Sequence, residues 1–173
     1  MDARAYVESH AREFIDDLKQ WLAIPSISAD PARHLDDALL QPTRVYVAAV
    51  HALWAAGVEP RGLVNISGGG LLNLGRLAAD VSYELDALPP PPPVFALIAE
   101  KGGVSAASMY ATFNMGTGFA IVVPAARQQA AMAALKSVGE EPARVGWVTG
   151  RPGRAVSVPA AGIRGRGDTF DTV

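Results

Sequence analysis

Asn-Ile-Ser-Gly-Gly-Gly-Leu-Leu, at residues 65–72, is a glycine-rich segment that indicates a turn between a strand and a helix. It follows a predicted short strand, residues 62–66, and leads into a predicted short helix, residues 71–78. Consecutive glycines at such a turn let the backbone approach an anion closely, because no Cβ stands in the way, and the helix dipole favours phosphate there. A tight turn without a ligand explains the same residues about equally well. The pattern matches neither the Walker A motif nor the dinucleotide-binding fingerprint.

The segments around this turn alternate between short strands and short helices. We expect further strands at 82–85, 118–123, 145–148 and 155–158, and further helices at 46–56, 95–101, 105–111 and 125–138. Five consecutive prolines at 89–93 predict a stiff, extended bridge. A Pro-Gly turn at 152–153 predicts that the last two strands pair as a hairpin, and the tail after Pro159 is predicted to be loose. This order favours an α+β fold over a doubly wound sheet.

The first 36 residues have a different character. Apolar side chains recur at helical spacing between residues 3 and 22, so an amphipathic helix is expected there. Residues 25–36 have the composition of a linker. We therefore divide the chain into a leader helix with its linker, residues 1–36, and a folded domain, residues 37–173.

Composition narrows the classes of partner. The chain has 173 residues, of which 18% are charged, and a net charge of −2, so it lacks the basic excess typical of proteins that bind nucleic acid or anionic membranes. It has no cysteine, which removes disulfides, thiolate metal sites and a cysteine nucleophile. We recognise neither a signal peptide nor a membrane-spanning stretch. We expect a cytoplasmic protein that has a small-molecule or protein partner and binds neither nucleic acid nor membrane.

Two further segments carry groups that suit ligand binding. Asn114 both donates and accepts hydrogen bonds, and Gly116 lets backbone groups reach a ligand, although a bulged strand entry explains this segment slightly better. Upstream, Thr43 and Arg44 precede a predicted helix. An arginine there can clamp a phosphate with two hydrogen bonds, but a lone arginine at such a place is more often a surface residue.

No complete catalytic constellation is recognisable. None of the histidines has metal-ligand spacing to another histidine or to a carboxylate; they are His10, His34 and His51. Ser67 lacks the surroundings of a nucleophile elbow. We therefore predict neither catalytic residues nor a metal site in this chain.

Taken together, these segments resemble aminoimidazole ribonucleotide synthetase, also called phosphoribosylformylglycinamidine cyclo-ligase, over residues 39–170. Residues 65–72 match the glycine-rich loop of that family, except that Asn65 stands where many members have histidine. The matching stretches, in the family's order, are residues 39–47, 65–72, 92–95, 109–116 and 139–146. Several motifs in order are more specific than one glycine loop, which favours a phosphate site over an empty turn.

The resemblance implies a mixed sheet with packed helices, as in the second domain of that two-domain enzyme. The family uses ATP and magnesium to close formylglycinamidine ribonucleotide into aminoimidazole ribonucleotide, and its first domain supplies much of the ATP and metal site. ATP and magnesium are thus implied for the complete enzyme, and no cofactor for this chain alone. The residues implied in binding substrate or phosphate are Thr43, Arg44, Asn65, Ser67, Gly68, Gly69, Gly70, Asn114 and Gly116.

The opening segment carries another resemblance. Residues 4–31 are similar to the first helix of M20-type metallopeptidases. That helix holds no metal ligands, and the ligand-bearing part of that family is absent here. We therefore do not predict a peptidase.

Two functions remain open. The first is the second half of a cyclo-ligase, which binds a phosphate-bearing ligand, is incomplete alone, and works with a separate chain that supplies the ATP-binding half. The second is a non-catalytic interaction or oligomerisation module, because a domain without its partner exposes a face that was once buried. In that case a homo-oligomer is the expected assembly.

Overall fold

The computed structural model describes residues 43–173, which belong to one compact unit. The expected leader helix at 3–22 and the expected domain boundary after residue 36 lie outside the described residues. In the part of the chain that is described, no helix is long and apolar enough to span a membrane.

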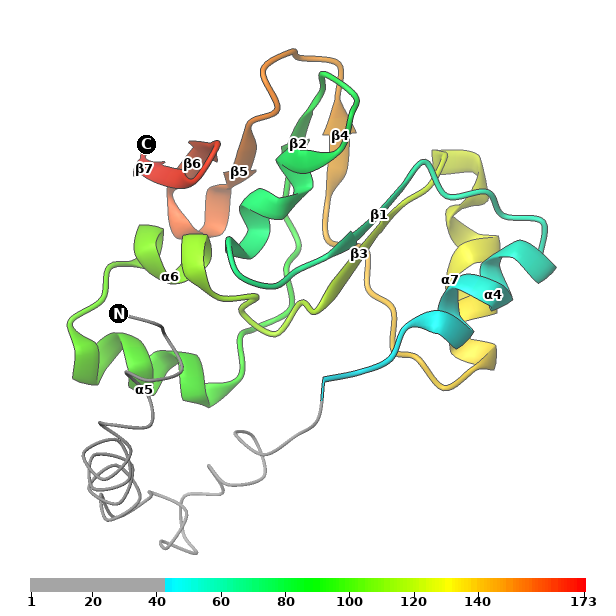
Figure 1. Ribbon diagram of the computed structural model, residues 1–173, viewed down its shortest axis with the longest axis horizontal. Helices are drawn as coiled ribbons and strands as arrows, with labels where there is room; N and C mark the ends of the chain where they lie inside the picture. The colour runs from blue at the N-terminus through cyan, green and yellow to red at the C-terminus, as the bar shows by residue number, and fades with distance from the viewer. Residues whose placement is uncertain (1–42) are drawn as a thin grey trace, which may run out of the picture. The chain divides into compact units, whose positions relative to one another are not determined.

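Short helices and short strands follow one another along the described chain, as Figure 1 shows. The α-helices are α4 (Val47–Ala55), α5 (Pro93–Gly102), α6 (Ala106–Thr112) and α7 (Gln128–Ser137). The strands are β1 (Gly62–Asn65), β2 (Ser82–Glu84), β3 (Phe119–Val122), β4 (Trp147–Thr149), β5 (Val156–Val158), β6 (Ile163–Arg166) and β7 (Thr169–Thr172). Three 3-10 helices complete the order: η2 (Gly70–Arg76), η3 (Ala125–Arg127) and η4 (Pro159–Ala161).

The strands form two sheets among helices, which confirms the α+β class predicted from the sequence. β1 and β3 pair antiparallel, with Asn65 opposite Phe119. The second sheet has the strand order β4-β2-β5-β6-β7. Its β2–β5 pair is parallel and its other pairs are antiparallel, so this sheet is mixed.

Two hydrophobic clusters hold these elements together. In the larger one, η2 packs on the five-stranded sheet, and Leu71, Val156 and Ile163 are almost completely buried. α6 lies against both η2 and β7 and covers the same cluster. In the smaller one, α4 packs against α7 around Leu53, which is fully buried. Burying a leucine side chain stabilises a fold by roughly 2 kcal/mol, so both clusters matter for stability.

The local predictions for helices need refinement at three places. The expected helix at 71–78 is the 3-10 helix η2, and the expected helix at 125–138 begins as η3 before it continues as α7. The proline run is extended only as far as Pro92, because Pro93 is the first residue of α5. Proline suits that position, where the missing N–H would have no partner in the helix.

The predicted hairpin between residues 145–148 and 155–158 is wrong, because β2 lies between those strands. β4 pairs with one edge of β2 and β5 pairs with the other. Two hydrogen bonds from the chain around the start of β2 hold the intervening loop across the sheet. Asp80 Oδ1 accepts from the Gly153 N–H at 2.7 Å, and Ser82 Oγ accepts from the Ala155 N–H at 3.1 Å. β5 is the central strand of this sheet, and its Val156 is completely buried.

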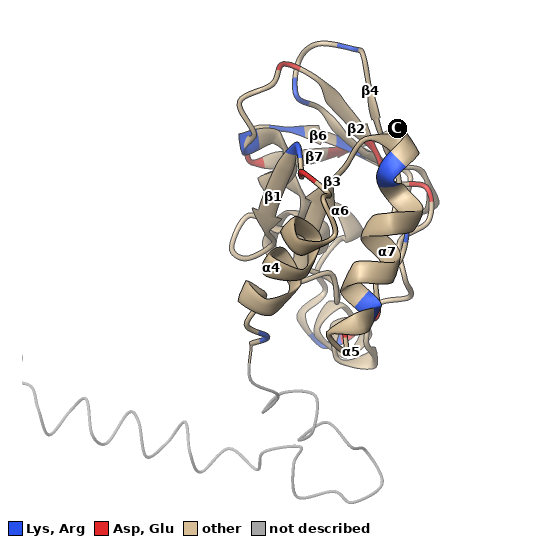
Figure 2. Ribbon diagram, turned by 90° about the vertical axis from the view of Figure 1, so that its right-hand side faces the viewer, with Lys and Arg blue, Asp and Glu red and all other residues tan. Residues whose placement is uncertain are grey.

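The prediction of a loose tail after Pro159 is wrong, because this segment forms the hairpin of β6 and β7. Ile163 and Gly165 face the core, while Arg164 and Arg166 face solvent. Figure 2 shows the basic residues along β6 in blue. Phe170 of β7 is buried against the larger cluster. The glycine and arginine content of the tail therefore reflects the two faces of a strand, which repeat every second residue.

Candidate functional site

The glycine-rich loop connects β1 to η2 and is anchored at both ends. At its start, the Ile66 N–H donates to the Gly118 carbonyl oxygen at 2.9 Å. At its end, the Gly70 N–H donates to the Ser67 carbonyl oxygen at 2.9 Å. Ser67 and Gly68 lie at the exposed tip. The loop is thus a fixed turn whose tip is open to a ligand.

The three glycines of the loop differ in whether the fold requires glycine at their position. Gly69 has a φ of +97°, and Gly70 has a φ of +53°, both in the left-handed region that disfavours other residues. A Cβ on Gly70 would also collide with the Tyr110 carbonyl oxygen. Gly68 has neither constraint: its φ is outside the left-handed region, and a Cβ there would have no heavy atom within 4 Å. Folding alone therefore does not explain the glycine at position 68.

Positive charge and hydrogen-bond donors gather at this tip. Within residues 43–173, the backbone N–H groups of Ser67, Gly68 and Gly69 have no hydrogen-bond partner. The guanidinium of Arg76 lies over the loop, because a Cβ on Gly69 would be 2.9 Å from its Nη2. Successive free N–H groups in a turn form a concave anion-binding surface, and an adjacent arginine strengthens it.

A buried side chain with an unused acceptor adjoins the loop. Asn73 is 2% exposed, and its Nδ2 donates to the Asn65 carbonyl oxygen at 3.3 Å. Its Oδ1 has no hydrogen-bond partner among the described residues, and a Cβ on Gly69 would lie 2.7 Å from it. Exchanging the two amide atoms would place oxygen against the Asn65 carbonyl, so the assigned orientation is the favourable one. The site therefore offers one acceptor beside its donors.

Arg76 and Asn73 are not among the site residues predicted from the sequence, although a signal for both is present. A 3-10 helix has three residues per turn, so residues three apart lie on one face. Gly70, Asn73 and Arg76 have that spacing in η2. In an α-helix neighbouring members of this series would still be close, but the first and the third would turn away from each other around the axis.

The second predicted segment lies beside the loop because β1 pairs with β3. The Thr117 N–H donates to the Asn114 carbonyl oxygen at 2.8 Å, and Asn114 Oδ1 accepts from the Gly116 N–H at 3.0 Å. Met115 and Gly116 both have positive φ, as in a type I′ turn. A Cβ on Gly116 would lie 2.6 Å from Pro92 Cδ. The turn thus explains Asn114 and Gly116 structurally, and their role in ligand binding stays a prediction.

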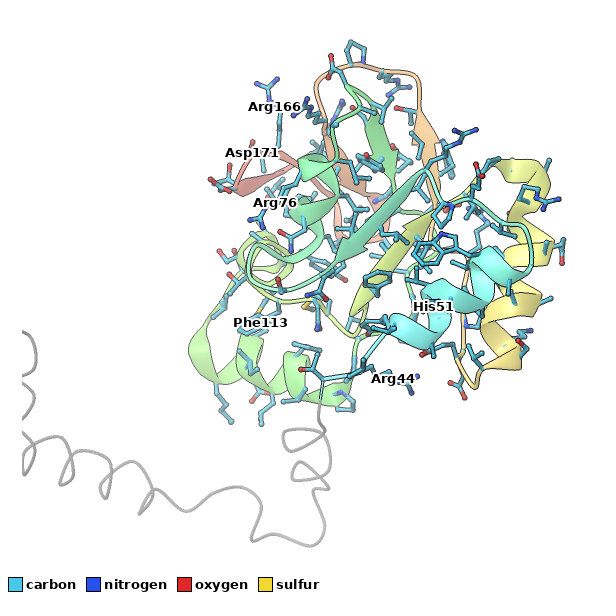
Figure 3. The ribbon with its side chains drawn as sticks, turned by 45° about the vertical axis from the view of Figure 1, so that its right-hand side comes forward. Arg44, His51, Arg76, Phe113, Arg166 and Asp171 are labelled. Carbon is cyan, nitrogen blue, oxygen red and sulfur yellow. The ribbon has the colours of Figure 1, made fainter. Side chains whose placement is uncertain are left out.

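The third predicted segment contributes a different residue from the one expected. The guanidinium of Arg44 pairs with the Glu140 carboxylate at 2.9 Å, and Figure 3 shows Arg44 and Arg76 far apart. Thr43 is exposed. The ring of Tyr46 stacks on that of Phe119 with 4.6 Å between centroids. The structure therefore brings Tyr46 to the strand that anchors the glycine loop, and phosphate binding by Thr43 and Arg44 stays a prediction.

The surroundings of Tyr46 shift its ionisation. Burial raises the pKa of the Tyr46 hydroxyl, the Glu140 carboxylate raises it further, and the Arg44 guanidinium lowers it. Burial likewise raises the pKa of Tyr83, against a lowering by Arg154. Both tyrosines therefore keep their protons to higher pH in the folded protein than in the unfolded chain.

We expect the free energy of unfolding to fall as the pH rises above about 10, the ordinary pKa of tyrosine. In that window the native state binds more protons than the unfolded state, so ionisation favours unfolding. Urea unfolding below and above that pH measures the fall. The Tyr46→Phe variant should show a smaller fall, with the remainder due partly to Tyr83. Equal falls in variant and wild type would contradict the assignment to Tyr46.

The described residues offer no evident metal site. Among residues 43–173, no group of three or more His, Cys, Asp or Glu side chains is arranged to hold a metal ion. The donors at the glycine loop are N–H groups and a guanidinium, whereas Mg²⁺ prefers oxygen ligands. This loop therefore suits an anion rather than a cation.

Comparison with known proteins extends this picture to relatives. The family model described as AIR synthase related protein, C-terminal domain, matches residues 9–159. The chain is 40% identical to phosphoribosylformylglycinamidine cyclo-ligase of Methanothermobacter thermautotrophicus, over 81% of this chain and 40% of that protein. For the protein of the same name from Burkholderia cenocepacia (strain HI2424) the identity is 42%, over 79% of this chain and 40% of that protein. For the protein of the same name from Methanopyrus kandleri the identity is 48%, over 53% of this chain and 26% of that protein.

The matched region has a consistent extent in these relatives. The chain spans about 40% of the length of the first two. The family model includes the glycine loop, η2 and all strands up to β5, which confirms the resemblance drawn from the sequence. Because that model covers most of the chain, this protein belongs to the family of AIR synthase related proteins and carries its C-terminal domain.

Proposed function

We propose that this domain forms the glycine-loop half of a cyclo-ligase active site and there binds the phosphate-bearing substrate. The reaction is the ATP-dependent closure of formylglycinamidine ribonucleotide, or phosphoribosylformylglycinamidine, to aminoimidazole ribonucleotide. The other half of that active site handles ATP, and the partner is a separate chain that supplies this ATP-binding half. The names of the relatives and the resemblance of the glycine loop support this assignment, for which the cytoplasm is the fitting location.

The observation that carries the proposal is the glycine at position 68. The conformation of the loop requires glycine at positions 69 and 70, but at Gly68 a side chain would meet nothing within 4 Å. An exposed, unconstrained glycine between free N–H groups keeps the approach to those groups open. A phosphate that touches the backbone there accounts for the absence of a side chain.

The groups around the loop match the chemistry of a ribonucleotide. The N–H groups of Ser67, Gly68 and Gly69 and the guanidinium of Arg76 donate to phosphate oxygens. Asn73 Oδ1 accepts from a hydroxyl or N–H group of the same ligand, which removes the cost of leaving it buried without a partner. In phosphoryl transfer, positioning and electrostatics supply most of the catalysis. This domain contributes the positioning of the substrate. Coordination of Mg²⁺ belongs to the ATP-binding half.

Isothermal titration of the full chain with formylglycinamidine ribonucleotide tests this function. We expect saturable binding that weakens at least about tenfold in Gly68→Val, because the isopropyl group blocks the backbone donors; tenfold corresponds to about 1.4 kcal/mol. Gly150→Val is the matched control, since Gly150 is also exposed, outside the left-handed region and free of neighbours within 4 Å. Its affinity should equal that of the wild type. Absence of binding, or equal weakening in both variants, would contradict the proposal.

A second candidate function, an interaction module, is favoured by exposed apolar side chains. On α4, Val47 is 61% exposed and Trp54 is 55% exposed, and these residues are seven apart, hence on one helical face. On β4, which has a free edge in its sheet, Trp147 is 50% exposed. Such side chains suit a protein partner, either the ATP-binding half or a second copy of this chain. A persistent oligomer that binds no ribonucleotide would favour this function over the first.

A further inference from the structure

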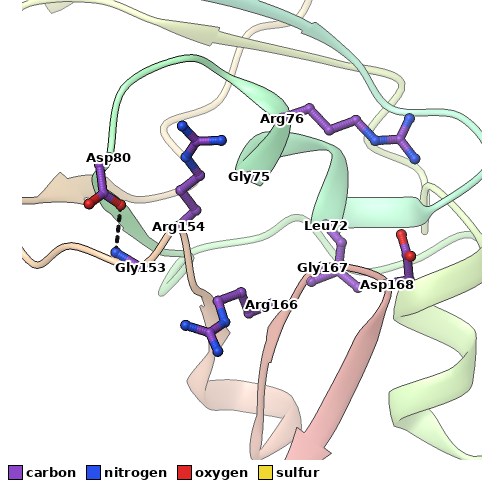
Figure 4. A pocket seen from close by; sticks show the side chains of 9 residues that line it. All are labelled: Leu72, Gly75, Arg76, Asp80, Gly153, Arg154, Arg166, Gly167 and Asp168. Atoms are coloured by element: carbon purple, nitrogen blue, oxygen red, sulfur yellow. Dashed lines mark hydrogen bonds between the residues drawn. The ribbon is translucent and has the colours of Figure 1, made fainter.

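A cavity lies beside the C-terminal half of η2, and its walls come from three separate segments (Figure 4). Its volume is about 360 Å³, near the lower end of the range for small-molecule pockets. The first wall is the end of η2, with Arg76. The second is the loop between β4 and β5, with Gly153 and Arg154. The third is the turn between β6 and β7, with Arg166 and Asp168.

The cavity carries an excess of positive charge. Three arginines line it, Arg76, Arg154 and Arg166, against two aspartates, which leaves one net positive charge. Within residues 43–173, none of these arginines has a carboxylate within 4.0 Å. The carboxylate of Asp80 instead accepts a hydrogen bond from the Gly153 N–H, at 2.7 Å. The guanidinium groups of Arg76 and Arg166 therefore remain available for an anionic ligand, whereas Arg154 also donates to a carbonyl oxygen of the chain.

The loop that carries Arg154 is held in place without a ligand. Arg154 has a φ of +53°, a left-handed conformation that arginine rarely adopts. Its Nη2 donates to the Ala78 carbonyl oxygen at 3.0 Å, and η2 packs closely on it, because a Cβ on Gly75 would lie 3.0 Å from the Arg154 carbonyl oxygen. Arg166 lies near the same turn, since a Cβ on Gly153 would be 3.8 Å from its Nη1. Arg154, from the loop between β4 and β5, and Arg166, from β6, thus both lie beside Gly153.

The third wall lies outside the part of the chain that the family model matches. That match ends at residue 159, whereas the turn between β6 and β7 begins after Arg166. The cavity therefore combines the end of η2, which the match includes, with a hairpin that it does not include. Its ligand need not be that of the glycine loop.

We propose that this cavity binds a small phosphomonoester of the size of a sugar phosphate, at a site that adjoins the glycine loop through Arg76 but is otherwise formed by Arg154, Arg166 and Asp168. A phosphate near neutral pH carries close to two negative charges and three terminal oxygens, which suits several arginines better than a carboxylate does. The Asp168 carboxylate accepts hydrogen bonds from hydroxyl groups of the sugar. The volume of about 360 Å³ suits a ligand of that size.

Isothermal titration with ribose 5-phosphate, inorganic phosphate and ribose tests the cavity. We expect saturable binding of ribose 5-phosphate, weaker binding of phosphate, and none of ribose at millimolar concentration. Arg166→Gln should weaken the binding of ribose 5-phosphate at least about tenfold, and Arg166→Lys should restore part of it, because the charge returns without the planar fork. Arg164→Gln makes the same change of charge on the exposed face of β6 outside the cavity and should leave the affinity unchanged.

The variants also separate this site from the glycine loop. Gly68→Val should leave the binding of ribose 5-phosphate intact, so the cavity can hold a ligand even if the proposed cyclo-ligase function is wrong. Equal weakening by Arg164→Gln would show that general surface charge attracts the ligand and would overturn the proposal. Weakening by Gly68→Val alone, or no saturable binding at all, would overturn it as well.

Discussion

Gly70→Ala is expected to lower the free energy of unfolding by about 3 kcal/mol, through left-handed strain and overpacking together. Gly70 has a φ of +53°, and its new Cβ would collide with the Tyr110 carbonyl oxygen and lie 2.9 Å from that of Phe113. Both oxygens belong to the backbone at the end of α6, so relief requires moving α6 away from η2. Urea unfolding followed by circular dichroism measures the loss.

Gly68→Ala is the matched control two residues earlier in the same loop. It introduces the same methyl group without strain or a close neighbour, so stability should stay within about 0.5 kcal/mol of the wild type. The pair distinguishes a glycine that the fold requires from one that a ligand requires. Equal losses in the two variants would show that this distinction is wrong.

Phe170→Ala is expected to destabilise the protein by about 3–4 kcal/mol. Phe170 is 7% exposed and packs into the larger hydrophobic cluster from β7. Its removal leaves a cavity between the C-terminal hairpin and the rest of the core, which the surrounding sheet and η2 can fill only in part. The change in the denaturant midpoint, at constant slope, reports this loss.

Asp171→Ala tests the same strand on its exposed face. Asp171 is exposed in β7, so its replacement should change stability by no more than about 0.5 kcal/mol. A loose tail would instead give small effects in both variants. A negligible loss for Phe170→Ala would therefore contradict the position of the hairpin in the core.

Local sequence signals identified the elements that lie next to each other along the chain. The strand before the glycine loop, β3 and the two helices around Gly102 and Gly103 were all expected at nearly their observed places. Glycine, proline and apolar runs within a few residues indicate these elements. The resemblance of the glycine loop also predicted the family correctly.

The order of strands could not be obtained in that way, because it depends on contacts between distant residues. β2 lies between β4 and β5, where the side chains of Asp80 and Ser82 accept hydrogen bonds from the N–H groups of Gly153 and Ala155, and no local pattern indicates this arrangement. Likewise, arginines and glycines after Pro159 look like a loop until Ile163 and Phe170 are seen to alternate with them. The ion pair of Arg44 with Glu140 likewise joins residues that are far apart in the sequence.

The candidate site was only partly predictable for the same physical reason. Gly68, Gly69 and Gly70 were selected as a group, yet their different roles follow from φ and from neighbours that approach from α6 and η2. The alignment of Asn73 and Arg76 with Gly70 depends on the type of helix after the loop, since a 3-10 helix places residues three apart directly in line, whereas an α-helix turns them gradually around its axis.

The most direct test of the glycine-loop site is an NMR titration of the full chain with formylglycinamidine ribonucleotide. Nitrogen–proton correlation spectra follow the signals of the N–H groups that are proposed to bind the phosphate. We predict saturable shifts of the backbone amide signals of Ser67, Gly68 and Gly69, accompanied by the Nε–H signal of Arg76, while amides on the exposed face of α5 stay in place. Saturable shifts elsewhere that leave these loop amides unchanged would contradict the phosphate site at the glycine loop, and so would a complete absence of shifts.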